Sequence, residues 1–126
     1  MYFEKLVLEV HAKNAGWEAV KPPVVQGKSG VLQKFSFLAT DGPRYYGFDI
    51  YSDVSEEAVL QTYMKRLDTE ALTVIISLSG RPRERVSKLA ENYGISILSP
   101  GDIEGFFNFD REGLVPTPRP VTGLSE

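Results

Sequence analysis

A run of β-branched and aliphatic residues, LTVIISL at 72–78, constrains the fold more than any other feature of the sequence. The run shows no polar–apolar alternation, which is typical of a strand buried on both faces of a parallel sheet. Parallel strands need crossover connections, and helical patterns lie on both sides of this run, at about 53–67 and 82–94. The sequence therefore predicts βαβ units in an α/β domain.

An antiparallel hairpin is expected before these units. Residues 31–40 and 44–51 alternate in the manner of strands, and the turn signal Asp41-Gly42-Pro43 separates them. The other expected elements are a helix at 2–15, a short buried strand at 95–98 and a last short helix after the capping sequence at 99–102. We therefore expect a mixed central sheet with the hairpin at one edge and helices on both faces.

Helical spacing also predicts which sides of the helices are apolar. In the first helix, the residues predicted to form one buried stripe are Phe3, Leu6, Val7 and Val10. In the second helix, one stripe contains Leu60, Met64 and Leu67, with Val59 and Tyr63 beside it.

The length and the position of the prolines indicate one domain with a tail. A chain of 126 residues is within the usual length of a single domain. We assign residues 1–113 to this domain and residues 114–126, LVPTPRPVTGLSE, to a proline-rich tail. Three prolines in five residues exclude a helix there, and we expect the tail to be dispensable for folding.

Composition excludes several classes of function. The chain has no cysteine and a single histidine, His11, which excludes cysteine nucleophiles, thiolate metal sites and histidine relays. It has no P-loop, dinucleotide-binding or nucleophile-elbow motif. No apolar run approaches the ~18 residues of a membrane span, and we expect a cytoplasmic protein with no membrane partner. The small number of Asn and Gln residues, three of each, is typical of proteins from hot environments.

Three short segments resemble a known family. The pair Phe3-Glu4 begins the first helical pattern, Gly16-Trp17 follows that pattern, and LAENYGISIL at 89–98 combines a helix end with a buried strand. In these segments and in the order of elements, residues 2–100 resemble the PD-(D/E)xK restriction-endonuclease-like superfamily, in the branch of Mrr-type endonucleases and archaeal Holliday junction resolvases. The resemblance implies a restriction-endonuclease-like fold and Mg²⁺-dependent cleavage of DNA.

The catalytic positions that the resemblance implies are Glu4, Ser36, Asp49 and Tyr51. The family has an Asp where this chain has Ser36 and a Lys where it has Tyr51, so the motif is degenerate. Asp49 and Glu4 are the acids that remain for a metal ion. A relocated lysine, either Lys34 or Lys65, is the candidate to restore the missing ammonium. We expect no cofactor unless the site is active, in which case Mg²⁺ is required.

Basic residues gather where the third helix is expected to begin, and they are Arg81, Arg83, Arg85 and Lys88. They are candidate phosphate contacts or a solubilising surface, and the net charge of −3 argues against a strong nonspecific DNA binder. The main hypothesis is a catalytically inactive or impaired nuclease-fold protein that contacts DNA or a DNA-bound partner. The alternatives are a protein–protein interaction module on a nuclease-like scaffold, and an active endonuclease with a relocated lysine. A homodimer is compatible with each of them.

Overall fold

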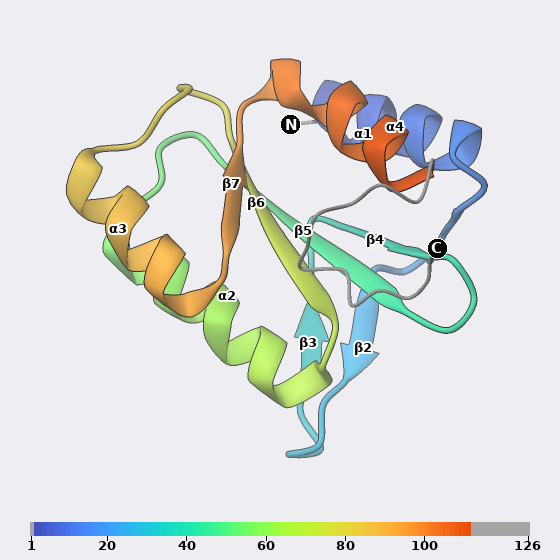
Figure 1. Ribbon diagram of the computed structural model, residues 1–126. Coiled ribbons are helices and arrows are strands. Elements are labelled where there is room, and N and C mark those ends of the chain that lie inside the picture. The colour runs from blue at the N-terminus through green and yellow to red at the C-terminus, as the bar shows by residue number, and fades with distance from the viewer. Residues whose placement is uncertain (1, 112–126) are drawn as a thin grey trace.

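The computed structural model describes residues 2–111, which form an α/β fold with a mixed sheet (Figure 1). This confirms the predicted fold class. The proline-rich tail at 114–126 lies outside the described residues. In chain order the elements are α1 (Tyr2–Asn14), β1 (Glu18–Ala19), β2 (Val24–Gln26), β3 (Leu32–Lys34), β4 (Phe37–Thr40), β5 (Tyr45–Tyr51), α2 (Glu56–Thr69), β6 (Leu72–Ser77), α3 (Glu84–Tyr93), β7 (Ser96–Leu98), the 3-10 helix η1 (Pro100–Asp102) and α4 (Ile103–Arg111).

The main sheet has five strands in the order β1-β4-β5-β6-β7. Strands β5, β6 and β7 are parallel, as the buried run at 72–78 predicts, and β4 is antiparallel to β5. The β4–β5 hairpin does not form the edge of the sheet, because β1 pairs with β4 and takes that place. Two residues are too few to give a strand pattern in the sequence, so β1 was not expected.

The predicted strand at 31–40 is divided in two. Strand β3 pairs with β2 in a separate two-stranded sheet, and β4 belongs to the main sheet. The chain changes sheets at Phe35 and Ser36, where the Phe35 N–H donates to the Pro23 carbonyl at 2.9 Å and the Ser36 N–H donates to the Phe48 carbonyl at 2.9 Å. These hydrogen bonds, one to the residue before β2 and one to β5, end the regular alternation, although the sequence pattern continues without a break.

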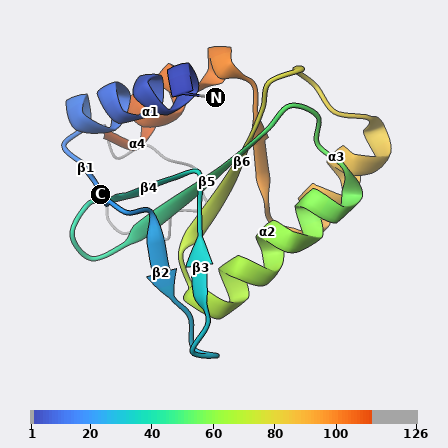
Figure 2. The same ribbon diagram turned by 180° about the vertical axis from the view of Figure 1, so that it is seen from behind.

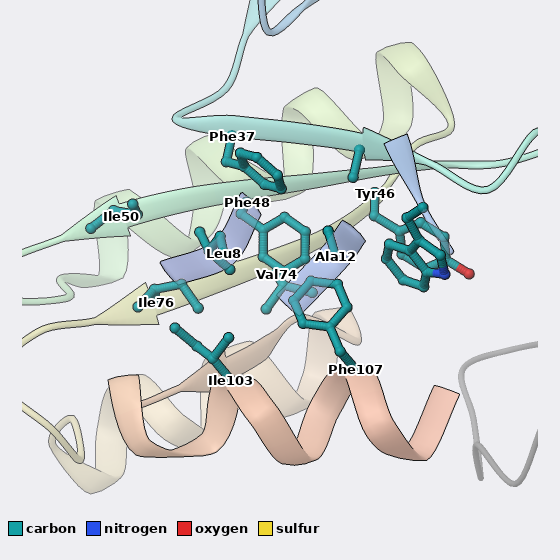
Figure 3. Packing of buried hydrophobic residues seen from close by; sticks show 12 residues of the cluster. Leu8, Ala12, Phe37, Tyr46, Phe48, Ile50, Val74, Ile76, Ile103 and Phe107 are labelled. Carbon is teal, nitrogen blue, oxygen red and sulfur yellow. The ribbon is translucent and has the colours of Figure 1, made fainter. Parts of the chain in front are cut away.

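Helices cover both faces of the main sheet. Helices α1 and α4 lie on one face, and α2 and α3 lie on the other (Figures 1 and 2). The core under α1 and α4 is rich in aromatic residues, which pack around Phe48 and Phe107 (Figure 3). At one end of it Trp17 stacks on Tyr46, with 4.1 Å between the ring centroids. The second core, under α2 and α3, is mainly aliphatic and includes Val59, Ile75 and Val86.

The buried stripe predicted for α1 is wrong for three of its four residues, and the fourth, Val7, packs against the core. Phe3, Leu6 and Val10 are 70%, 43% and 55% exposed, whereas Leu8 and Ala12 are buried against the sheet. The helix has two apolar sides, and helical spacing alone does not determine which one faces the sheet. The stripe of Leu60, Met64 and Leu67 on α2 also points outward. No helix within residues 2–111 is both long and apolar enough to cross a membrane.

Candidate functional site

The centre of the candidate site is Asp49, a carboxylate buried in the middle of the main sheet. Its neighbours Phe48 and Ile50 point into the aromatic core, so alternation along β5 turns Asp49 towards α2. The residue is 5% exposed. A carboxylate in such a place must be paired. Moving an unpaired charge from water into the protein interior costs on the order of several kcal/mol, even after the surrounding structure has relaxed.

Two side chains of α2 satisfy this carboxylate. The Lys65 ammonium donates to both oxygens of Asp49, at 3.1 Å from Oδ1 and 3.0 Å from Oδ2. The Thr62 hydroxyl donates to Oδ2 at 3.1 Å. Residues 62 and 65 are three apart on a helix, so their side chains lie on adjacent turns and reach the same strand residue together.

The Lys65 ammonium has further contacts on its other side. It donates to the Lys34 carbonyl oxygen at 2.6 Å and lies 5.0 Å from the centroid of the Phe35 ring. Of the two lysines proposed as relocated, the structure therefore brings the Lys65 side chain to Asp49. Lys34 contributes its backbone carbonyl, and its side chain is exposed.

The other two motif positions on the hairpin are Ser36 and Tyr51, and both side chains form hydrogen bonds within the protein. The Ser36 hydroxyl oxygen accepts from the Ile50 N–H at 3.0 Å. Burial and then the negative charge of Asp49 raise the pKa of the Tyr51 hydroxyl, against a smaller opposing effect of its hydrogen bond with Thr62. Tyr51 is therefore neutral at physiological pH and supplies no positive charge where the family has a lysine.

Glu4 lies apart from this group. It belongs to α1, which covers the opposite face of the sheet from α2 (Figure 2). The structure brings Asp49, Lys65 and Tyr51 together with Ser36 beside them on the hairpin, but it does not bring Glu4 to Asp49. Within the described part of the chain, no cluster of three or more His, Cys, Asp or Glu residues is arranged to hold a metal ion.

The Asp68 side chain of α2 holds the β2–β3 hairpin against this helix. We call its hydrogen bonds with Ser29 and Gln33 the Asp68 latch. The Asp68 carboxylate accepts from the Ser29 N–H at 2.9 Å, from the Ser29 hydroxyl at 2.8 Å and from the Gln33 side-chain amide at 2.9 Å. Gly27 packs so closely that a Cβ atom there would overlap this carboxylate. The latch fixes β3, and β3 carries the Lys34 carbonyl that binds Lys65. Sequence reasoning gave Asp68 no role, because its partners are 35 and 39 residues away.

We expect this latch to open in acid. The hydrogen bonds from Gln33 and then from Ser29 lower the pKa of Asp68 below its ordinary value of 3.8. A lowered pKa in the folded state means that the ionised carboxylate stabilises the docked hairpin above about pH 3.9, and that this contribution is lost as the pH falls through the folded pKa. The protection factors of Ser29 and Gln33 in amide hydrogen exchange, which compare the measured rate with the intrinsic rate at the same pH, should therefore fall as the pH drops through the folded pKa, and Asp68→Asn should lower them already at neutral pH.

The matched control for Asp68 is Glu70, which also binds the hairpin. Its carboxylate forms an ion pair with Lys28 at 3.0 Å, and both side chains are largely exposed. Exposed pairs contribute little to stability, so Glu70→Gln should leave the exchange of Ser29 unchanged. Equal effects of the two substitutions would show that the hairpin is not held by Asp68.

The predicted DNA-binding cluster lies at the start of α3, but two of its four members are paired with carboxylates. Arg85 binds Glu56 at 2.8 Å, and the Lys88 ammonium lies 3.8 Å from Glu84. Arg83 is the N-cap residue of α3. Arg81 lines a cavity of about 870 Å³ along α3 and β7, which is also lined by Glu84, Glu91 and Asp102. Three carboxylates on the lining make the interior of this cavity a poor site for phosphate, but the Arg81 side chain is also exposed to solvent.

Comparisons of the chain with protein-family models, with curated proteins and with solved structures found no match. The resemblance to the PD-(D/E)xK superfamily therefore stays a prediction.

Proposed function

We propose that this chain is a binding protein on a restriction-endonuclease-like scaffold, without nuclease activity of its own. The observation that carries the proposal is that the Lys65 ammonium occupies both oxygens of Asp49. In this reading Asp49 has become a structural residue that holds α2 on the sheet. The cytoplasmic location expected from the sequence stays a prediction.

The chemistry of the group opposes metal-dependent cleavage. Mg²⁺ binds oxygen ligands at about 2.0–2.1 Å in near-octahedral geometry, and nuclease sites use two or three carboxylates to hold it. Here a single carboxylate has an ammonium 3.0 Å away. A metal ion would have to displace the Lys65 ammonium from Asp49. The ammonium would keep its contact with the Lys34 carbonyl oxygen and would lie close to the positive charge of the metal ion. Lys65 is placed where an active endonuclease would need its relocated cation, but within residues 2–111 no cluster of three or more His, Cys, Asp or Glu residues is arranged to hold the metal ion.

The surface supports a protein partner over DNA. The chain is acidic, with 17 Asp and Glu against 14 Lys and Arg. Its largest exposed apolar side chains include a group on α1 and a group on α2. Exposed apolar groups of this kind mark sites of protein interaction, whereas DNA-binding surfaces are rich in unpaired cations.

The test is a cleavage assay with labelled duplex, single-stranded and four-way-junction DNA in millimolar Mg²⁺ or Mn²⁺. We expect the wild-type protein to give no more product than Asp49→Asn, because the Asp49 carboxylate is bound to Lys65. Thermal melting of both proteins establishes that they are folded. Cleavage by the wild type that is lost in a folded Asp49→Asn variant would contradict the proposal.

The second candidate function is contact with DNA phosphates. The residues that favour it are Arg81 and Arg83. Both are exposed, and no ion pair with a carboxylate is formed by either within residues 2–111. If they contact phosphates, replacing both by alanine should reduce the slope of log affinity against log salt by about 1.8, at ~0.9 per phosphate on duplex DNA. The double variant Arg85→Ala/Lys88→Ala is the control, because these two cations are already paired. Equal slopes for all three proteins would exclude this route.

A further inference from the structure

The β2–β3 hairpin is attached to the domain mainly by polar contacts. From Val24 to Lys34, a segment that the structure describes throughout, the only buried residue is Gly27, which has no side chain. Val25 is partly buried and packs at the margin of a small apolar cluster. An element that buries so little apolar surface can separate from its domain without unfolding the rest.

The polar contacts of the outer part of the hairpin come from the C-terminal end of α2. The Asp68 latch supplies three hydrogen bonds, two to Ser29 and one to Gln33. The Lys28 N–H donates to the Asp68 carbonyl oxygen at 2.8 Å, and the Lys28 ammonium forms an exposed ion pair with Glu70. Residues 68–70 therefore hold this part of the hairpin against the helix (Figures 1 and 2).

The inner end of the hairpin lies against the candidate site. Lys34, the last residue of β3, accepts a hydrogen bond from the Lys65 ammonium at its carbonyl oxygen, and the Phe35 ring lies 5.0 Å from the same ammonium. Lys65 and Asp68 are three residues apart on α2, so both side chains face the hairpin. The side chains of Lys65 and Asp49 are 22% and 6% exposed. The hairpin thus shields the ammonium on the side that Asp49 does not occupy.

The base of the hairpin is fixed more firmly than its tip. Phe35 is 3% exposed, and its N–H donates to the Pro23 carbonyl at 2.9 Å. The next residue, Ser36, is bound to Phe48 of the main sheet. The tip, at Ser29, is exposed and is held by the latch. The motion open to the hairpin is therefore a swing of the tip about Pro23 and Phe35.

We infer that the β2–β3 hairpin is a lid over the Asp49–Lys65 pair and that the Asp68 latch keeps this lid closed. When the latch breaks, the hairpin swings away from α2, the Lys34 carbonyl leaves the ammonium, and solutes reach Lys65. When the latch is closed, the pair is shielded from them. The lid controls access to the candidate site whether or not that site cleaves DNA.

Two substitutions open the latch by different routes. Asp68→Ala removes the acceptor of all three hydrogen bonds. Gly27→Ala keeps the carboxylate but places a Cβ atom where that group lies, 2.8 Å from Asp68 Oδ1 and closer still to Oδ2 and Cγ. The Asp68 side chain has to move away from its partners to make room. One variant acts through hydrogen bonding and the other through steric overlap, so a shared result is due to the opening of the lid.

The experiment measures how fast the Lys65 amine is acetylated by a limiting amount of an N-hydroxysuccinimide ester, with each lysine of the full chain quantified by mass spectrometry. Lys13, which is exposed on α1, is the internal reference. In the wild type Lys65 should react at least about tenfold more slowly than Lys13, which corresponds to about 1.4 kcal/mol for opening. Each variant should raise the ratio of Lys65 to Lys13 labelling by about fivefold or more, because a lost hydrogen bond to a charged group shifts an equilibrium by at least this factor.

Two matched substitutions leave the latch intact. Glu70→Gln removes the exposed ion pair with Lys28, and Gly105→Ala adds a Cβ atom that meets nothing within 4 Å. Both should keep the labelling ratio of the wild type. Amide protection of Ile75, in the central strand β6, shows in every variant that the domain is folded and that Lys65 is not labelled through global unfolding.

Three results would overturn the lid. The first is a wild type in which Lys65 reacts as fast as Lys13. The second is a pair of variants that lose amide protection in the hairpin while Lys65 stays slow, which would show that the hairpin moves without uncovering the pair. The third is unchanged hairpin protection in both Asp68→Ala and Gly27→Ala, which would show that the latch does not hold the hairpin.

Discussion

Replacing Lys65 by Met is expected to lower the free energy of unfolding by about 3 kcal/mol, because it leaves the Asp49 carboxylate buried without its ammonium. The value is near the lower end for a buried pair, since 22% of the Lys65 side chain is exposed and water can reach part of the site. For a domain of this size the melting temperature should fall by about 10 °C. Urea unfolding followed by circular dichroism measures the difference directly.

A double-mutant cycle separates the pair from the packing of the lysine chain. Asp49→Leu combined with Lys65→Met removes both charges, and the double variant should lie within about 1 kcal/mol of the wild type, because buried ion pairs are often replaced by apolar groups at little cost. If Lys65→Met alone changes stability by less than about 0.5 kcal/mol, the pair is not the buried contact described here.

The second large effect is expected at Gly47, where alanine should cost about 2 kcal/mol through overpacking. A Cβ atom at Gly47 would collide with the buried Phe35 ring, whose Cζ atom would be 2.8 Å away and whose Cε1 atom would be closer still. Phe35 cannot move without disturbing the Lys65 ammonium that lies over its ring. Thermal melting of Gly47→Ala should therefore show a loss of stability together with faster amide exchange in α2.

Gly105→Ala is the matched control for this substitution. A Cβ atom at Gly105 in α4 would meet no atom within 4 Å. Alanine in a helix is favoured over glycine by about 0.8–1 kcal/mol, so this variant should be as stable as the wild type or more so. A neutral Gly47→Ala would show that the Phe35 ring does not lie against β5.

The sequence predicted the fold class because its main signals are local. The run at 72–78 and the helical patterns beside it identify parallel strands and crossover helices. Two features depend on contacts between distant residues and could not be predicted. The edge strand β1 is defined by its pairing with β4, and the break at Phe35 is defined by hydrogen bonds to Pro23 and Phe48.

The buried sides of α1 and α2 could not be predicted for a different reason. Both α1 and α2 have apolar residues on more than one side, so periodicity cannot decide which side is buried. On α1 the small Ala12 and the adjacent-turn Leu8 face the sheet, and the larger Phe3 does not. The outward stripes are visible only once the fold is known.

The candidate site was predicted in part. Alternation along 44–51 placed Asp49 and Tyr51 on one side of a strand, and the structure places both beside Thr62 of α2. The sequence left Lys34 and Lys65 as equal candidates, because the choice depends on how α2 crosses β5. Glu4 is on the other face of the sheet, which the order of elements alone did not fix.

We propose that the Lys65 ammonium keeps Asp49 unavailable to a metal ion. Amide NMR spectra recorded during a titration with Mn²⁺ test it directly, because the paramagnetic ion broadens the signals of nearby residues. We expect no selective broadening of the Asp49 and Ile50 signals. Selective broadening of these signals in the wild type, abolished by Asp49→Asn, would instead show that the carboxylate binds metal and is not closed off by Lys65.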